Sequence, residues 1–140
     1  MRVLALDVGD VRIGVAISDP LGMIASPLEV IDRRKVKAIK RIVELAKEKK
    51  VEKIVSGLPL SLNGTEKRQA EKVREFIEKL GKSLHDIPIE TVDERYSTVS
   101  ADNMLKVTTK KNAKEKRKVV DKVAATIILQ TYLDMEKRRR

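Results

Sequence analysis

The spacing of apolar residues changes once along this chain of 140 residues, and that change restricts the fold more than any other feature. The first quarter holds short apolar segments separated by turn-forming residues, which predicts an antiparallel meander of strands at residues 3–8, 13–18 and 23–30. After residue 33, amphipathic helices alternate with short strands: helices at 33–50 and 65–80, strands at 53–57 and 87–92. Strands joined through helices favour parallel pairing. The sequence therefore predicts an α/β fold with a mixed five-stranded sheet, a three-strand antiparallel meander plus two parallel strands, and helices on both faces.

Local signals refine this expectation. Thr65 is placed to cap the second helix and Gly81 to end it, while Pro88 predicts an edge position for the last strand. The final third of the chain predicts a short helix, then a lysine-rich segment without apolar periodicity, then a closing helix, at residues 98–106, 107–118 and 119–135. If the first strand is central, its C-terminal end lies beside that of the fourth, where α/β folds bind ligands.

The composition excludes several classes of protein. There is no cysteine, which excludes disulfides, thiolate metal sites and a cysteine nucleophile, and which suits a reducing cytosol. No apolar stretch has the length of a membrane span, and the N-terminal apolar run is too short for a signal peptide. We therefore expect a cytoplasmic protein without membrane contact, built as a single domain over residues 1–140.

The net charge of +10 is unevenly distributed. Residues 106–140 hold 12 Lys and Arg against 4 Asp and Glu, which is typical of a polyanion-binding face. A lysine-rich, heat-adapted surface is the alternative, although it does not explain an excess at one end. Phe76, Tyr96 and Tyr132 are the only aromatic residues, which favours contact with nucleic-acid backbones over base stacking. The candidate phosphate contacts are Lys110, Lys111, Lys114, Lys116, Arg117 and Lys118, with a further basic tail at residues 137–140.

Acidic residues at three places are candidates for catalysis. Asp7 lies near the end of the most apolar strand, where a carboxylate is costly unless it is paired or bound to a cation; capping of the following turn is the alternative. Asp93 and Glu94 close the last strand on opposite faces, so only one of them would point towards Asp7. Asp121 precedes the small residues Ala124 and Ala125 in the closing helix, although a helix dipole also favours an acid there.

Three carboxylates that converge on one place repel each other and need divalent cations. Two such cations about 4 Å apart could activate water for phosphodiester hydrolysis. We find no other catalytic set, because His85 lies in an expected surface loop without a serine or cysteine motif around it. The glycine-bounded loop at residues 57–64 either shapes a nucleic-acid groove or simply connects strand and helix.

Four motifs together, in order and over nearly the whole chain, resemble the YqgF family. They are the opening segment Leu6–Ala16, the loop from Gly57 to Gly64, the Asp93-Glu94-Arg95 motif with Ser97-Thr98, and the helix segment from Asp121 to Gln130. Members of this family are RNase H-like proteins, described both as Holliday junction resolvases and as nucleases that mature the 5′ end of pre-16S rRNA. Each motif alone would be weak, but their matching spacing makes the resemblance specific.

The resemblance implies a single RNase H-like nuclease domain that holds Mg²⁺ or Mn²⁺, as two ions, through Asp7, Glu94 and Asp121. Arg12 and Arg95 belong to the same motifs and are further candidates for phosphate contacts. One departure from other RNase H-like resolvases is that the fourth strand ends in Ser56-Gly57, without a carboxylate, so Glu94 must reach across from its neighbour.

Rival functions remain open from the sequence. A nucleic-acid-binding module with a nuclease-like fold would explain the missing acid on the fourth strand. An ATPase of the actin and sugar-kinase type also begins with an Asp-x-Gly hairpin, but it needs two lobes. The sequence separates neither pre-rRNA from branched DNA as substrate nor a monomer from a homodimer.

Overall fold

The computed structural model of the protein describes residues 1–59, 64–93 and 113–138. Its centre is a five-stranded sheet in the order β3-β2-β1-β4-β5. The strands are β1 (Val3–Val8), β2 (Arg12–Ser18), β3 (Ala25–Asp32), β4 (Lys53–Leu58) and β5 (Ile89–Asp93). β1, β2 and β3 pair antiparallel, whereas β4 pairs parallel with both β1 and β5. The predicted mixed sheet is confirmed, as are the central place of β1 and the edge place of β5 behind Pro88.

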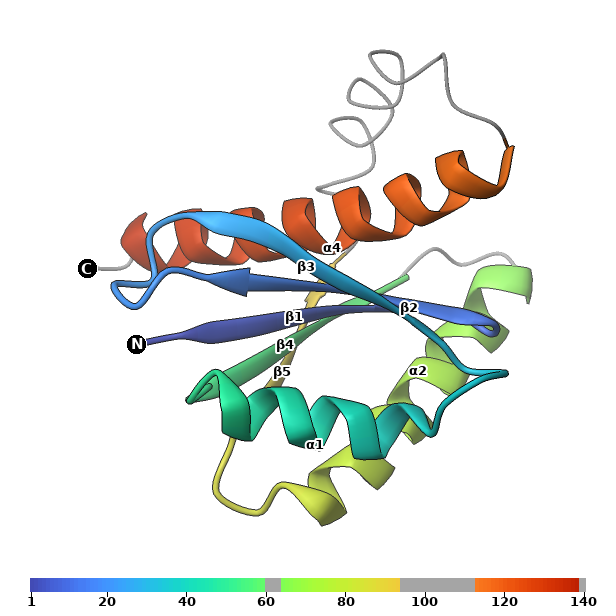
Figure 1. Ribbon diagram of the computed structural model, residues 1–140, viewed down its shortest axis with the longest axis horizontal. Helices are drawn as coiled ribbons and strands as arrows, with labels where there is room; N and C mark the ends of the chain where they lie inside the picture. The colour runs from blue at the N-terminus through green and yellow to red at the C-terminus, as the bar shows by residue number, and fades with distance from the viewer. Residues whose placement is uncertain (60–63, 94–112, 139–140) are drawn as a thin grey trace.

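Helices cover the sheet on both faces (Figure 1). The helices α1 (Ala38–Glu48) and α2 (Gly64–Ser83) lie on one face, and the long helix α4 (Ala113–Arg138) lies on the other. The β1–β2 turn, the β3–α1 connection and the N-terminal end of α2 gather at the same end of the sheet (Figure 1). That end is the C-terminal end of β1, which the sequence predicts as the ligand-binding end.

Alternation along the strands creates two apolar cores. Leu4 and Leu6 of β1 face α1 and α2, in a cluster with Ile54 of β4, Ile42 of α1 and Leu80 of α2, all at most 1% exposed. The intervening β1 residues, Val3 and Ala5, pack with Ala125, Ile128 and Leu129 of α4. β1 is buried on both faces, which explains its continuously apolar sequence.

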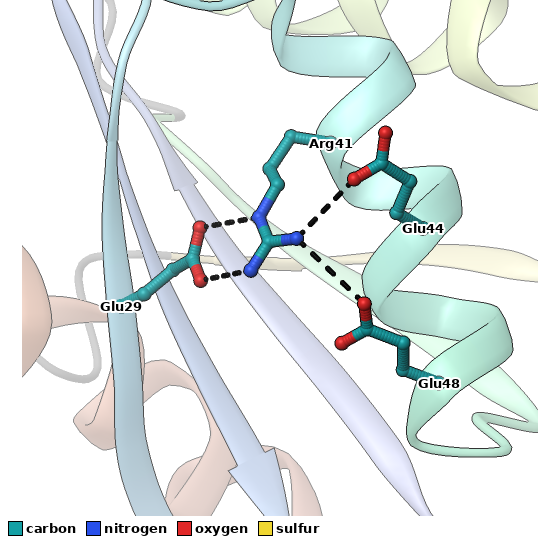
Figure 2. A network of polar contacts seen from close by, with 4 residues as sticks. All are labelled: Glu29, Arg41, Glu44 and Glu48. Carbon is teal, nitrogen blue, oxygen red and sulfur yellow. Dashed lines mark hydrogen bonds and ion pairs between the residues drawn. The ribbon is translucent and has the colours of Figure 1, made fainter.

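An arginine fastens α1 to the edge of the sheet (Figure 2). Arg41 donates two hydrogen bonds, of 2.9 and 2.7 Å, to the carboxylate of Glu29 on β3. It also approaches Glu44 and Glu48 of its own helix, at 3.3 and 3.9 Å. The Glu29 hydrogen bonds are the main cause of a raised Arg41 pKa. The planar fork of the guanidinium matches the carboxylate and sets the position of α1.

Two element boundaries in the first half of the chain differ from the prediction. β3 begins at Ala25 rather than at 23, because the Asp19 carboxylate accepts the Met23 and Ile24 N–H groups and holds them in the turn. α1 begins at Ala38 rather than at 33. Asp32 accepts hydrogen bonds from the backbone and side chain of Arg34, which lower its pKa to about 2 and stabilise a turn ahead of the helix.

The prediction that Gly81 ends the second helix is wrong. α2 continues through Gly81 to Ser83, and the Leu84 N–H still donates to the Leu80 carbonyl. Leu80 and Leu84 lie one turn apart and are 0% and 8% exposed. Burial of this pair favours another helical turn over a glycine stop.

α4 begins at Ala113, six residues before the predicted start, so part of the lysine-rich segment is helical. Lys, Glu and Arg have high helix propensity, and a lack of apolar periodicity does not oppose a helix built from them. The short helix expected at 98–106 lies outside the described residues. Among the described helices, none is long and apolar enough to cross a membrane.

Candidate active site at the C-terminal end of β1

Asp7 lies on the α4 face of the sheet. It alternates with Leu6 and Val8, which belong to the core beneath α1 and α2, and it therefore shares a face with Val3 and Ala5. Its flanking residues are buried, whereas Asp7 itself is half-buried. The carboxylate thus stands on a central strand at the end where α/β folds bind ligands, as predicted.

Glycines flank Asp7 on both neighbouring strands. Its partner across the antiparallel pair is Gly14 of β2. On the parallel side, Leu6 pairs with Ser56, which places the next residue of β4, Gly57, beside Asp7. Both glycines are buried and neither has a side chain to fill the space on this face. Glycine at such strand positions allows close approach of a ligand or another backbone.

The absence of an acid at the end of β4 has a structural consequence that the sequence analysis did not predict: the position beside Asp7 is a glycine. Gly57 pairs in turn with Val92 of β5, so Asp7, Gly57 and Val92 form one row across the sheet. On this face of β4, the position between Asp7 and Val92 carries no side chain. Gly14 and Gly57 are visible in the sequence, but their positions on either side of Asp7 depend on strand register.

The register also separates Asp93 from Asp7. Asp93 pairs with Leu58, a member of the core beneath α1 and α2, and therefore lies on the face opposite Asp7. Glu94 lies outside the described residues, as do Arg95, Lys110 and Lys111. Of the two acids at the end of β5, Asp93 thus lies on the face of the sheet away from the candidate site.

Arg12 lies on the same face of the sheet as Asp7. It precedes Gly14 by two residues on β2, and its carbonyl accepts the Gly9 N–H at 3.0 Å, which closes the β1–β2 turn. A Cβ at Gly9 would come within 2.6 Å of the Arg12 carbonyl oxygen, so only glycine fits this turn. The tight turn keeps the start of β2 close to the end of β1.

The orientation of α4 is set by contacts at the far end of the sheet. Lys53, at the start of β4, donates a 2.7 Å hydrogen bond to the Tyr132 hydroxyl, and this contact raises the Lys53 pKa. Gln130 accepts the Ala25 N–H of β3 at 2.9 Å. The C-terminal half of α4 therefore lies over the start of β1, and its N-terminal half extends towards the Asp7 end (Figure 1).

The remaining sequence candidates divide between the two halves of this helix. Asp121 belongs to α4 one turn before Ala125, which is 0% exposed beneath the helix. Four basic candidates fall in its first turns: Lys114, Lys116, Arg117 and Lys118. Lys137 and Arg138 lie in its last turn, at the end of the sheet away from Asp7.

The donor chemistry around Asp7 fits a hard divalent cation. A carboxylate supplies the oxygen ligands that such an ion prefers, and the chain has no thiolate to select a softer metal. Within the described residues no group of three His, Asp or Glu is gathered closely enough to hold a metal ion. Asp7 is the only one of the three predicted ligands whose side chain is described.

Sequence reasoning also missed a second basic region. Five of the eight residues from Arg33 to Lys40 are Lys or Arg, and none is acidic. That run is a signal visible in the sequence, although it is smaller than the C-terminal excess. These residues lie on the α1 side of the sheet.

Comparison with known proteins identifies the family. The family model described as "RuvX: Holliday junction resolvase" matches residues 1–135. A protein of Fusobacterium nucleatum is 65% identical over 97% of this chain and 99% of its own length. A protein of Desulforamulus reducens is 50% identical over 96% and 97%. Both are named "Putative pre-16S rRNA nuclease".

Solved structures support the same fold. The RuvC of T. thermophilus in complex with a Holliday junction substrate has a TM-score of 0.59 at 14% identity, with 96% of each chain covered. The Holliday junction resolvase of fowlpox virus has a TM-score of 0.58 at 12% identity, with 97% of this chain and 99% of its own covered. With its five-stranded mixed sheet and a family match over residues 1–135, the chain belongs to the RuvX nuclease family, as the resemblance to YqgF proteins implies.

Proposed function

We propose that the chain is a single-domain, cytoplasmic, metal-dependent endonuclease that hydrolyses a phosphodiester in the 5′ leader of pre-16S rRNA. The carrying observation is Asp7, which stands at the C-terminal end of the central strand between the side-chain-free positions of Gly14 and Gly57. The relatives named for this RNA match at up to 65% identity across the whole chain. The likeness to DNA junction resolvases, at 12–14% identity, supports the fold alone.

Asp7 would act with Glu94 and Asp121. Glu94 follows Asp93 by one residue, so continuation of the extended backbone would turn it to the face of the sheet that Val92 and Asp7 share. Asp121 precedes Ala125 by one turn of α4, a spacing that places two residues on one face of a helix. Strand and helix would thus bring three carboxylates to one place.

Each residue then has a defined task. The three carboxylates would bind Mg²⁺ or Mn²⁺, which supplies Lewis-acid activation of water and neutralises charge on the phosphate. Gly14 and Gly57 would let the phosphate backbone approach the sheet. Arg12, on the same face, would bind a neighbouring phosphate and so fix the position of the RNA strand relative to the carboxylates.

The first test is cleavage of a labelled pre-16S leader in Mg²⁺ and in Mn²⁺ by wild type and by single carboxylate variants. Asp7→Asn and Glu94→Gln should each lower the cleavage rate at least about 100-fold, because a lost metal ligand removes several kcal/mol of transition-state stabilisation. Asp93→Asn is the matched control, since it removes the neighbouring charge on the opposite face, and it should cleave like wild type.

A four-way DNA junction and plain duplexes belong in the same assay. Preferred cleavage of the junction would replace the RNA role by the resolvase role. If wild type and Asp7→Asn both bind nucleic acid and neither cuts any substrate, the chain is a binding module with a nuclease fold.

A further inference from the structure

An open groove of about 1140 Å³ runs between α1 and α2, on the face of the sheet opposite Asp7. One wall is the β3–α1 connection with the outer stripe of α1, and the other is a stripe of α2 that includes Lys72, Phe76 and Lys79. Lys40 and Lys47 lie two turns apart on α1, as Lys72 and Lys79 do on α2, a separation of about 10 Å along each helix. Each pair spans roughly three nucleotides of a nucleic-acid strand at about 3.4 Å per nucleotide.

The groove is strongly basic. Eight of its 17 lining residues are Lys or Arg, and three are Asp or Glu. The outward stripe of α2 provides an internal comparison, because Glu71, Arg74, Glu78 and Lys82 are all exposed and balance in charge. On α2, therefore, the outward stripe is balanced in charge, whereas the lining of the groove carries a positive excess. A concave surface of one sign concentrates its field on a polyanion.

Arg33 is held in a fixed position at the mouth of the groove. Its guanidinium donates a 2.8 Å hydrogen bond to the Gly9 carbonyl and lies 5.2 Å from the centre of the Phe76 ring. A guanidinium has five N–H donors in a rigid fork. Arg33 thus joins the β1–β2 turn to α2 as a preorganised phosphate-binding group.

The same end of the groove leads back to the candidate active site. Asp10 lines the groove, contacts Lys72 at 3.4 Å and lies three residues after Asp7 in the β1–β2 turn. The β1–β2 turn therefore lies at the Asp7 end of the sheet (Figure 1) and also contributes Asp10 to the lining of the groove. The walls are well fixed, because Arg41 holds α1 on β3 from outside the groove (Figure 2).

We propose that this groove binds the phosphate backbone of the RNA that flanks the cleavage site. The substrate would pass from Asp7 around the β1–β2 turn and continue between α1 and α2. The proposal rests on the nuclease function above and deepens it. In this proposal, recognition of the length and shape of the substrate depends on a surface remote from the carboxylates.

The test compares two variants that remove the same charge. Lys40→Gln with Lys79→Gln removes two positive charges from the groove, and Arg74→Gln with Lys82→Gln removes two from exposed positions outside it. RNA affinity is measured in an Asp7→Asn background, which keeps the RNA intact, with leader RNAs trimmed stepwise from either end. Melting temperatures confirm that each variant folds.

The groove variant should bind the full-length leader about tenfold more weakly at about 0.15 M salt. Each lost phosphate contact of a single strand lowers the slope of log affinity against log salt concentration by about 0.7, and the variant loses two such contacts. The control should change affinity by less than about twofold. With RNA trimmed to the segment around the cleavage site, groove variant and wild type should bind alike. In the active protein the groove variant should raise KM and leave kcat unchanged.

Equal affinity of wild type and groove variant for the full-length leader would overturn the proposal and assign the groove to another partner, such as an acidic protein. Equal losses in the groove and control variants would also overturn it, since they would reflect net charge alone. Neither result depends on whether the wild-type protein cleaves the leader, so the groove and the nuclease function can fail separately.

Discussion

At the scale of single residues, two aspartates near strand ends show how surroundings decide the use of one side chain. Asp19, after β2, accepts N–H groups from Leu21, Met23 and Ile24, and these hydrogen bonds lower its pKa. Asp7 instead occupies a strand position between Gly14 and Gly57, neither of which carries a side chain. The first carboxylate stabilises a turn, and the second is the proposed metal ligand.

The pKa of Asp19 leads to a prediction about stability and pH. Because its folded-state pKa is lowered from 3.8, Asp19 stabilises the fold at pH values above about 4 and loses that effect as pH falls through the lowered pKa. Asp19→Asn should therefore have a lower urea midpoint than wild type at neutral pH, and the gap should close as the pH falls below 3.8 and the folded protein's carboxylate becomes protonated. A gap that stays constant over this range would show that charge is not the cause.

At the scale of elements, small residues bring α4 close to the sheet. Ala5 and Ala16 pair directly across β1 and β2, and both are 0% exposed, as is Ala125 of α4 in the same core. Side chains of this size allow a helix to pack near the backbone of the strands. In the proposed site, this close approach would determine how near α4 brings Asp121 to Asp7.

Enlarging this contact should affect both stability and activity. Ala125→Leu should lower the free energy of unfolding by about 2 kcal/mol, because overpacking displaces the helix. Cleavage should fall as well, measured where the variant remains folded, since Asp121 lies one turn away. Ala124→Leu, at a half-exposed position, is the control and should cost less. Unchanged cleavage by folded Ala125→Leu would separate the position of α4 from catalysis.

At the scale of the whole molecule, the sheet divides two sites of opposite charge. The proposed function would gather acidic ligands on the α4 face, and a basic groove lies between α1 and α2. The two faces meet at the β1–β2 turn. A net charge of +10 promotes encounter with a polyanion, while the carboxylates need a cation before a phosphate can approach.

Divalent cations should therefore stabilise the folded protein as a whole. Three carboxylates in one place repel each other in the folded state, and an ion that binds only that state raises its stability. At a concentration about ten times its Kd, Mn²⁺ should raise the Tm of wild type by about 4 °C. Asp7→Asn should show little response, and an equal shift in both proteins would place the cation elsewhere.

The order of elements, the parallel and antiparallel pairings, the central place of β1 and the edge place of β5 could all be predicted from the sequence alone. These features follow from local patterns: apolar period, turn residues and one proline. Asp7 could be recognised for the same reason, as an acid within an otherwise apolar strand. The ends of helices were less predictable, since burial of Leu80 and Leu84 extends α2 through Gly81.

Tertiary structure decided what local patterns do not contain. Strand register places Gly14 and Gly57 beside Asp7 and turns Asp93 to the other face, and a shift of one residue would reverse both results. The basic run at residues 33–40 is visible in the sequence, but the groove exists only because α1 and α2 pack side by side and bring residues 33–47 together with residues 72–83. Sites formed between elements depend on packing, because the distance between two side chains is fixed by the fold and not by their separation in sequence.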